Sequence, residues 1–390
     1  MKKKIALLIL LALALTLILT ACRQPDATKI IPRWSTEGES YVYDVKLADF
    51  AETGNKRFAS YTNPADKDAY YKDYLIRAGE PLDSLDEVRP VSVEGTYTLT
   101  TSHLADDKYD RVETKQELYV TYELQDGKLK LGENMLVQLS DKFDEFIVKT
   151  ESNRITLKST TETMVEFKRN DNGKQAPVKS GTSVDGFYVG KAHQEVSKYE
   201  IATEYKYESK KTVAEIKLTT YKYDESQKAF TIETSELSDE MKRRTEGTFI
   251  DSNQLFMYTR SFDKTSTSFA DSPSVTVYNP LNQELQTASF SFTAAANVYL
   301  TNGSNNLYAK LPMVSVVVGG MPFMIQMSAP KLLDEKDQGP DRAKYGTEYY
   351  AKHTPVRFRV GYLSYELQYE VGTPQNELWN ALTSYAESKK

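Results

Sequence analysis

The sequence predicts a mainly β protein, an antiparallel meander that forms a large curved sheet, sandwich or open barrel, with one or two accessory helices. Three observations carry this prediction. Polar and apolar residues alternate with a period of two from about residue 92 to about residue 310. Tyrosine, which favours strands, is abundant at 27 residues. Short polar breaks rather than helical crossovers separate the alternating segments, so neighbouring strands should run in opposite directions.

The clearest alternation lies in KYEIATEYKYE, residues 198–208. Tyrosine, isoleucine and threonine fall on one face of this segment and mostly charged residues on the other, which is typical of a half-buried strand. TVAEIKLTTYKYD and KAFTIETSEL follow after short polar breaks, so the three segments are predicted to form a meander. QELYVTYELQDGKLKL has the same rhythm, with a hairpin turn at Asp126-Gly127.

Residues 312–327, PMVSVVVGGMPFMIQM, form the most apolar run after the N-terminal segment. Gly319-Gly320 is a two-residue turn of the kind that needs positive φ, so the run is predicted to be a hairpin. Pro322 has no backbone N–H, so the second strand should be an edge near this residue or be covered by something other than a strand. The predicted opposing pairs, all on one face, are Val318 with Met321, Val316 with Phe323 and Val314 with Ile325.

The opposite face of this hairpin holds the candidate binding residues. It is unusually apolar for a surface, and methionine re-packs around ligands of different shapes. We therefore predict a groove there for an apolar or lipid-like ligand. The alternative is that one face packs in the core while the C-terminal helix or a loop covers the other. The groove residues are Met313, Ser315, Val317 and Met324.

Two helices and one internal boundary are predicted along the chain. Asn63-Pro64 can cap and start a helix over 64–78, which should lie on the sheet. A second helix begins at Thr373-Pro374 and occupies the C-terminal segment 373–390. Residues 238–247, SDEMKRRTEG, are the most charged interruption of the meander, and they are expected to form either an internal boundary or a long hairpin loop.

The N-terminal residues predict export and lipid attachment. Met1–Lys4 is cationic, and Ile5–Leu19 is a nearly continuous apolar run that is short for a membrane span. Leu19-Thr20-Ala21-Cys22 then places small residues before the one cysteine of the chain. These positions resemble the lipobox of bacterial lipoproteins, and the resemblance covers about the first 22 residues. It implies cleavage before Cys22, a diacylglyceryl group with fatty chains such as palmitate on its sulfur, and a place on the extracytoplasmic face of the cell membrane.

The domain organisation follows from these segments. We expect a signal peptide over 1–21, a flexible tether over 22–39, an antiparallel β region over 40–372 and the C-terminal helix over 373–390. The tether carries two prolines, scattered charges and no hydrophobic period. Because no second cysteine exists, the exported fold must be held together without disulfides.

Composition and motifs predict neither nucleic-acid binding nor a catalytic, metal or cofactor site. The formal net charge is −6 and lysine and arginine do not cluster, which argues against a nucleic-acid partner. The three histidines stand in unrelated settings, and the acidic loop at 334–341 is interpreted as a solvated connector. Ser261-x-x-Lys264 resembles the nucleophile motif of penicillin-recognising enzymes, but it lies in a strand-like context over 255–269 and no Lys-Thr-Gly accompanies it.

The sequence therefore predicts a non-catalytic, lipid-anchored protein outside the cytoplasmic membrane that binds an apolar or lipid-like ligand. Its expected partners are the membrane, through Cys22, and an apolar small molecule or an envelope component. Two alternatives remain at this point. A hydrolase of cell-envelope polymer would bring a serine, a histidine or two carboxylates together in a cleft, and a scaffold lipoprotein of an envelope assembly would expose an apolar patch. The many tyrosines could also form a platform for sugar rings, although such residues are more often half-buried in strands.

Overall fold

The structure is a computed structural model, and it describes most of the predicted β region. The predicted signal peptide, Cys22 and the helix predicted at 64–78 lie outside the described residues. The described ranges are 38–47, 90–104, 109–131, 135–169, 175–189, 194–259, 274–302, 305–318, 321–327, 354–360, 363–369, 378–380 and 382–384.

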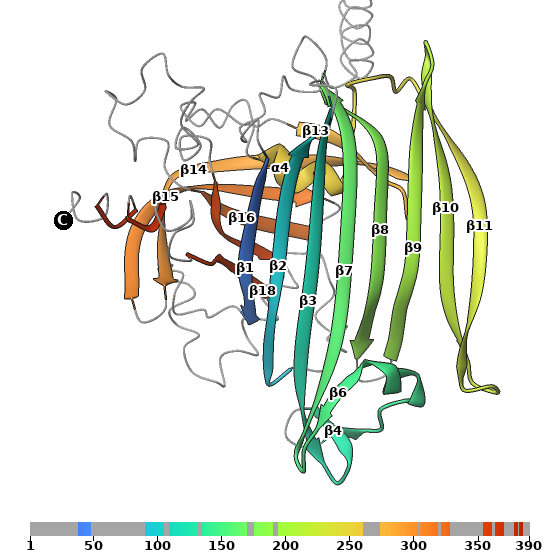
Figure 1. The fold of residues 1–390 in the computed structure, drawn as a ribbon, viewed down its shortest axis with the longest axis vertical. Coiled ribbons are helices and arrows are strands. Elements are labelled where there is room, and N and C mark those ends of the chain that lie inside the picture. Colours follow the sequence, from blue (N-terminus) through green and yellow to red (C-terminus); the bar gives the residue numbers. More distant parts are fainter. Residues whose placement is uncertain are drawn as a thin grey trace, which may run out of the picture.

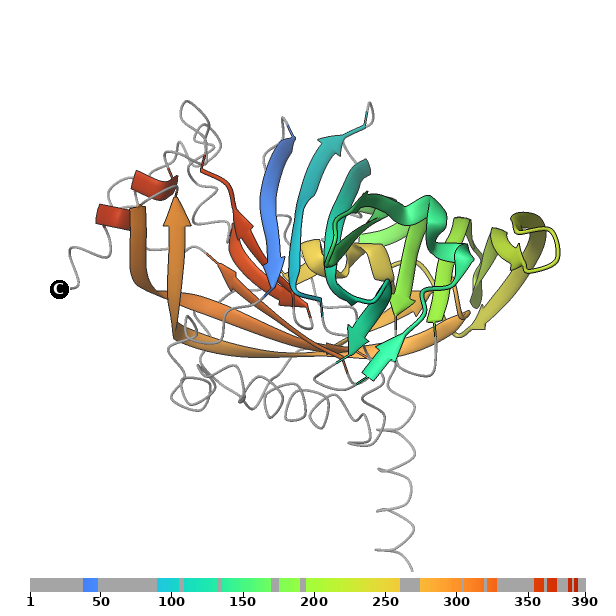
Figure 2. The same cartoon turned by 90° about the horizontal axis from the view of Figure 1, so that it is seen from below.

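The described strands form one continuous sheet folded into two layers, which confirms the predicted fold class. Figures 1 and 2 show the second layer running across the long strands of the first. The first layer comprises β1 (Glu39–Leu47), β2 (Ser92–His103), β3 (Tyr109–Gln125), β7 (Arg154–Arg169), β8 (Gln175–Val189), β9 (Gln194–Tyr207), β10 (Lys211–Asp224) and β11 (Ala229–Lys242). The second comprises β13 (Ser274–Asn279), β14 (Glu284–Asn302), β15 (Asn305–Val318), β16 (Met321–Met327), β17 (Pro355–Val360) and β18 (Leu363–Leu367).

Smaller elements decorate this sheet. A short excursion between β3 and β7 pairs with the ends of those two strands. A helical segment follows β11 and lies between the two layers (Figure 2). These elements are β4 (Lys128–Leu131), β5 (Met135–Val137), η3 (Asp141–Phe146), β6 (Ile147–Thr150), β12 (Ile250–Asp251), η4 (Ser252–Gln254) and α4 (Leu255–Tyr258).

The first described strand, β1, pairs with the last, β18, so segments from the two ends of the β region are neighbours in the sheet. β1 lies between β2 and β18, with Tyr43 opposite Tyr97 on one side and Leu367 on the other. Pairings are antiparallel throughout the described residues except for the short parallel pair β12–β13. Within these residues β11 pairs with β10 alone, and β13 pairs with β12 and β14. The sheet is therefore curved but not closed into a barrel.

The predicted meander is confirmed in β9, β10 and β11. Ile201, Thr203 and Tyr205 of β9 are buried while the residues between them are exposed. Within the charged stretch 238–247, β11 continues to Lys242, which pairs with Lys211, and residues 243–249 then lead to β12. Glu240 and Lys242 are exposed, whereas Met241 turns into the core at 3% exposure and Asp239, on the same face, accepts a hydrogen bond from the Tyr278 hydroxyl at 2.9 Å.

Both predicted hairpins are also confirmed. Asp126 and Gly127 have φ values of 53° and 72°, as a tight turn between twisted strands requires. β15 and β16 pair in the predicted register, with Val316 opposite Phe323. β17 covers the outer edge of β16, but that ladder begins at Phe323, one residue past Pro322. The missing N–H of the proline therefore interrupts no pairing with β17.

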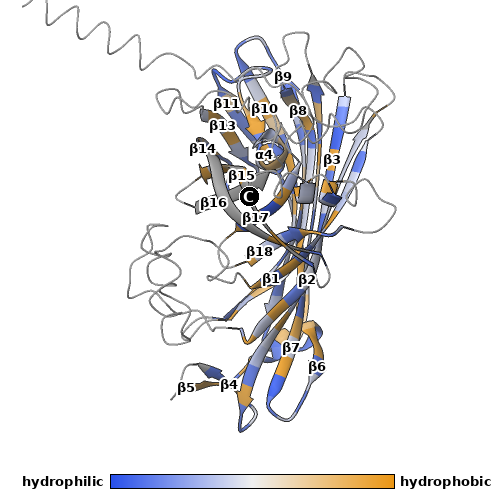
Figure 3. Ribbon diagram, turned by 90° about the vertical axis from the view of Figure 1, so that its left-hand side faces the viewer, coloured by the Kyte–Doolittle hydropathy of each residue, from blue (hydrophilic) through white to orange (hydrophobic). Residues whose placement is uncertain are grey.

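The main core lies between the two layers, and Figure 3 shows hydrophilic and hydrophobic residues alternating along the long strands. The inward residues of the second layer include Val314 and Val316, exposed by 0% and 1%. Residues 378–380 and 382–384 are helical, within the range where a C-terminal helix was predicted, and Leu378 and Leu382 join this core. No helix in the described part of the chain is long and apolar enough to cross a bilayer.

Two glycines in the first layer differ in how much space surrounds them. A Cβ atom on Gly95 of β2 would collide with the carbonyl oxygen of Glu117 and lie 2.8 Å from Cδ2 of Leu118. β2 and β3 therefore approach each other too closely for any side chain at this position. A Cβ atom on Gly181 of β8 would meet nothing nearer than 3.7 Å, so neighbouring atoms do not demand a glycine there.

Candidate functional site: an aromatic cavity between the layers

The helical segment between the layers begins at Asp251. The Asp251 carboxylate accepts a hydrogen bond from the backbone N–H of Asn253 at 2.7 Å, and the Gln254 side chain accepts one from the N–H of Asp251 at 2.9 Å. This reciprocal capping box starts η4 and α4 at the end of β12. The strand-like context expected over 255–269 is therefore wrong for 255–258. The local capping signal outweighs the weak alternation there.

Polar contacts fix this segment against the first layer. The Asn253 side-chain amide donates to the carbonyl oxygen of Gly181 at 3.1 Å and to Oγ1 of Thr182 at 3.0 Å. The Tyr205 hydroxyl donates to Asp251, which is fully buried. Burial raises the pKa of the Asp251 carboxyl, although its hydrogen bonds with Tyr205, Ser180 and the backbone of Asn253 oppose the shift. The segment is thus held from β8 and β9 by buried polar groups.

Aromatic rings gather where this segment meets the second layer. Phe358 of β17 stacks on Tyr365 of β18, with ring centroids 4.2 Å apart and planes 10° from parallel. Tyr97 of β2 points its ring edge-on at both, with centroids 5.5 Å away in each case. The ring centroid of Phe256, in α4, lies 4.7 Å from that of Phe358. The cluster joins three strands and the helical turn, and edge-on and stacked geometries are the favourable ones for such rings.

Two adjoining cavities surround this cluster. The first, about 240 Å³, lies between α4, β15, β17 and β18, and the second, about 210 Å³, lies between α4, β2, β3 and β7. Tyr97, Gln116, Ser252 and Phe256 line both. Aromatic and aliphatic side chains make most of the first lining, which includes no charged residue. The remaining residues of the first cavity are Leu255, Thr259, Val316, Phe358, Val360 and Tyr365.

A few polar groups at the cavity walls are placed by hydrogen bonds. The Tyr365 hydroxyl donates to Oε1 of Gln116 at 2.7 Å, and the Thr259 hydroxyl donates to the carbonyl oxygen of Phe256 at 2.6 Å. Burial raises the pKa of the Tyr97 and Tyr365 hydroxyls above the usual value, so both stay protonated at neutral pH. The cavity can therefore offer neutral hydrogen bonds but no compensating charge for an ionic ligand.

The residues predicted from the sequence lie on the other side of the second layer. Met313 and Ser315 are half-buried and Val317 is 43% exposed, all on the outward face of β15, while Met324 stands opposite Ser315 in β16. The register therefore brings these four positions together as predicted. The cavity, however, adjoins the inward face of the same strand through Val316. The lipidation residue, Cys22, lies outside the described residues.

Sequence reasoning missed the cavity because its walls come from seven separate elements. One sequence signal could have predicted the helical turn that forms a wall of the cavity. Asp-x-x-Gln at 251–254 matches a capping box, which is typical of the start of a helix. His193, His353 and the acidic loop lie outside the described residues, and His103 belongs to β2. Among the residues that the structure covers, no group of three histidine, cysteine or acidic side chains is arranged to hold a metal ion.

Comparisons with known proteins place the chain in no family. No family model matches the sequence, and no curated protein matches it. A solved structure that is similar in part is the crystal structure of a beta-barrel-like protein of domain of unknown function DUF1849 from Brucella abortus. It is 10% identical, with a TM-score of 0.37 over 86% of this chain and 96% of that one.

Proposed function

We propose that this protein is a lipid-anchored binding protein outside the cytoplasmic membrane that holds a small, neutral, apolar ligand between its two sheet layers. The uncharged, ring-lined cavity beside Phe358 and Tyr365 is the observation that carries the proposal. An apolar cavity of about 150 Å³ already suffices to stay dry and take up a benzene-sized molecule. A cavity of about 240 Å³ with apolar walls and a few oriented polar groups has the make-up of a ligand site.

Neighbouring residues of β15 provide a matched test. Val316 faces the cavity, whereas Val317 faces outward beside Ser315 and Met313. The neutral dye N-phenyl-1-naphthylamine, which fluoresces in apolar surroundings, should bind the purified protein saturably. Val316→Phe should fill the cavity and weaken binding about tenfold, a loss of about 1.4 kcal/mol. Val317→Phe should leave the affinity unchanged.

The opposite result would be equally informative. If Val317→Phe weakened binding and Val316→Phe did not, the ligand would lie in the groove predicted beside Met313 and Met324, and the interior site would be wrong. Circular dichroism and thermal unfolding of each variant would verify that it is folded. Val360→Phe, on β17, repeats the filling test from another wall of the same cavity.

Membrane attachment rests on the lipobox resemblance at Leu19–Cys22. Two acyl chains on Cys22 would anchor the protein stably, because one chain alone gives only marginal binding. Cys22→Ser should move the protein from the membrane fraction of its host to the soluble fraction. Ala21→Ser, which keeps a small residue and the cysteine, should leave it in the membrane. Carbonate-resistant membrane association of Cys22→Ser would show that another segment provides the anchor.

A further inference from the structure

A second hollow lies on the opposite side of the first layer, on the face that points away from the core. This outer groove has a volume of about 610 Å³ and crosses β2, β3, β7, β8, β9 and β10. The strand registers align its side chains in two rows. One row is Thr100, Glu113, Met164, Gly181, Ala202 and Lys217, and the other is Thr98, Lys115, Glu162, Ser183, Glu200 and Thr219.

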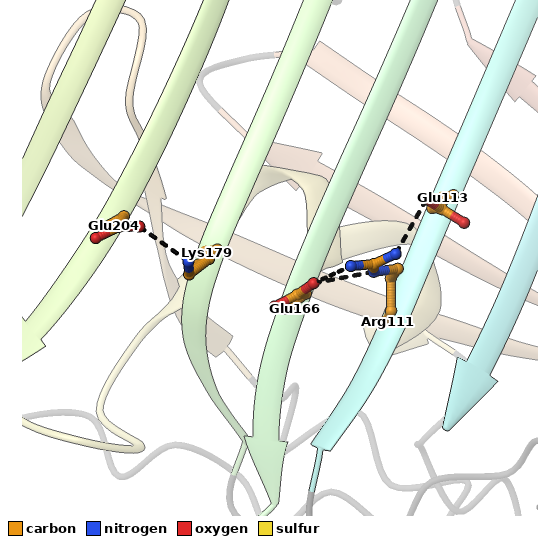
Figure 4. Close-up of polar contacts among 5 residues, drawn as sticks. All are labelled: Arg111, Glu113, Glu166, Lys179 and Glu204. Atoms are coloured by element: carbon orange, nitrogen blue, oxygen red, sulfur yellow. Dashed lines mark hydrogen bonds and ion pairs between the residues drawn. The ribbon is translucent and has the colours of Figure 1, made fainter. Parts of the chain in front are cut away.

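The groove exists because small side chains lie beside a row of long ones. Gly181, Ala202 and Ser183 form its middle. The next register row along the strands, from Arg111 to Glu204, carries long ion-paired side chains, which Figure 4 shows standing on the same face. Lys179 contacts Glu204 at 2.9 Å, and Arg111 pairs with Glu166. These ion pairs lie in the register row next to the groove, and Arg111 also contacts Glu113, which lines it, at 3.8 Å.

Gly181 is the residue that points to a ligand. Glycine destabilises a strand relative to alanine, and it usually persists for a turn, a bulge or a close approach. Gly181 has no positive φ, and a Cβ atom there would make only ordinary contacts, 3.7 Å from the carbonyl oxygen of Ile201 and 3.9 Å from Cε of Met164. The fold does not use the space above this residue. Occupancy of that space by a bound molecule would account for the glycine.

The strands under the groove limit how a ligand can be recognised. β3, β7, β8 and β9 are each paired on both sides, so their backbone groups are already used and a peptide cannot add there as a further strand. Recognition must come from side chains. The groove offers carboxylates, ammonium groups and hydroxyls in close alternation.

Charge on the groove is mixed rather than of one sign. Lys115 and Glu162 pair at 2.6 Å, and the Tyr221 hydroxyl donates to Glu200 at 3.2 Å. Lys217 makes no ion pair within the described residues. Neither a polyanion nor a polycation would find complementary charge here. A neutral chain with many hydroxyl groups could both donate to the carboxylates and accept from the ammonium groups, with its C–H faces over Met164 and Ala202.

We propose that the outer groove binds a neutral oligosaccharide laid across the strands, with a sugar ring above Gly181 and Ala202. Six strands about 4.8 Å apart span about 24 Å, which is long enough for several linked rings. The site is distinct from the interior cavity. The protein would then hold an apolar molecule inside and a glycan chain outside.

Gly181 allows a test in which stability and binding move in opposite directions. Affinity electrophoresis and calorimetry with chitohexaose, maltohexaose, xylohexaose and mannohexaose should reveal saturable binding of at least one of them to the full chain. Gly181→Ala should raise the unfolding midpoint and weaken binding severalfold, and Gly181→Leu should weaken it more than tenfold. Thr96→Leu, on the same face of β2 outside the groove, should bind as the wild type does.

Three outcomes would overturn the proposal. The first is no saturable binding across the four oligosaccharides. The second is unchanged affinity in Gly181→Leu. The third is that a heparin fragment or an extended peptide binds instead with the same dependence on Gly181, which would assign the groove to another chemistry. Dye binding in the interior cavity should be unaffected by Gly181→Leu, so this proposal and the cavity proposal can fail separately.

Discussion

Phe358→Ala should destabilise the protein by about 3–5 kcal/mol, the usual loss for truncating a buried phenylalanine. Phe358 is 4% exposed, stacks on Tyr365 and contacts the rings of Tyr43 and Phe256 with centroids 5.2 and 4.7 Å away. Removing it withdraws the ring that joins the second layer to β1 and to α4. The loss of dispersion contacts and the enlarged void both contribute. Urea unfolding followed by tryptophan fluorescence and circular dichroism would measure the change.

Ile232→Ala is the matched control for that measurement. Ile232 lies on β11 and is 67% exposed, so its truncation should change the stability by less than about 0.5 kcal/mol. Equal effects of the two substitutions would mean that the aromatic cluster does not hold the layers together. Phe358→Leu, which keeps most of the buried volume, should recover part of the lost stability.

Asp251→Ala should cost about 2–4 kcal/mol, because it removes a helix cap and leaves the buried Tyr205 hydroxyl without its acceptor. Asp251→Asn keeps one of the two acceptor oxygens, so it can retain the helix cap but not also the hydrogen bond from Tyr205, and it should cost less than Asp251→Ala. Since α4 carries Phe256 and Leu255 into the cavity wall, Asp251→Ala should also weaken dye binding. Chemical denaturation and dye titration of the two variants would separate the contribution of the helix cap from that of the hydrogen bond with Tyr205.

The pH dependence of these variants has a definite sign. Burial raises the folded-state pKa of Asp251 above its ordinary value of 3.8. A group with a raised folded-state pKa contributes its full stabilisation below the unfolded value and loses it as pH rises through the folded value. The stability of the wild type relative to Asp251→Asn should therefore fall as pH rises from about 4. A relative stability that grows over the same range would mean that the folded state favours the charged carboxylate.

Local pattern was enough for the meander and the hairpins. The alternation in 198–208 placed Ile201 and Tyr205 on the buried face, and Gly319-Gly320 set the register of β15 and β16 by counting. Both features depend only on residues close together in the sequence. A strand alternates with a period of two, and a two-residue turn allows only one pairing register between the strands that it joins. In the charged stretch 238–247 the strand β11 runs on to Lys242, since Met241 keeps its period, and the chain leaves the meander only after that residue.

The cavity could not be anticipated in the same way. The hydroxyl of Tyr43 donates to the carbonyl oxygen of Pro355 at 2.9 Å, across 312 positions of sequence, and the pairing of β1 with β18 that allows it has no local signal. Phe358, Tyr97 and Phe256 each look like an ordinary core residue of its own segment. The cavity forms only when the strands and the helical turn that carry these three residues pack together.

By itself, the sequence determined that the chain is built of antiparallel strands, which segments form hairpins and which residues of each strand turn inward, and its first 22 positions predict the anchor. The tertiary structure alone decided that the sheet folds over itself, that a cavity lies beside Val316 on the inward face of β15, and that Gly181 opens onto a groove. The reason is physical: periodicity and turn chemistry act over a few residues. A cavity is a mismatch of shape among distant segments, and it arises only after they pack.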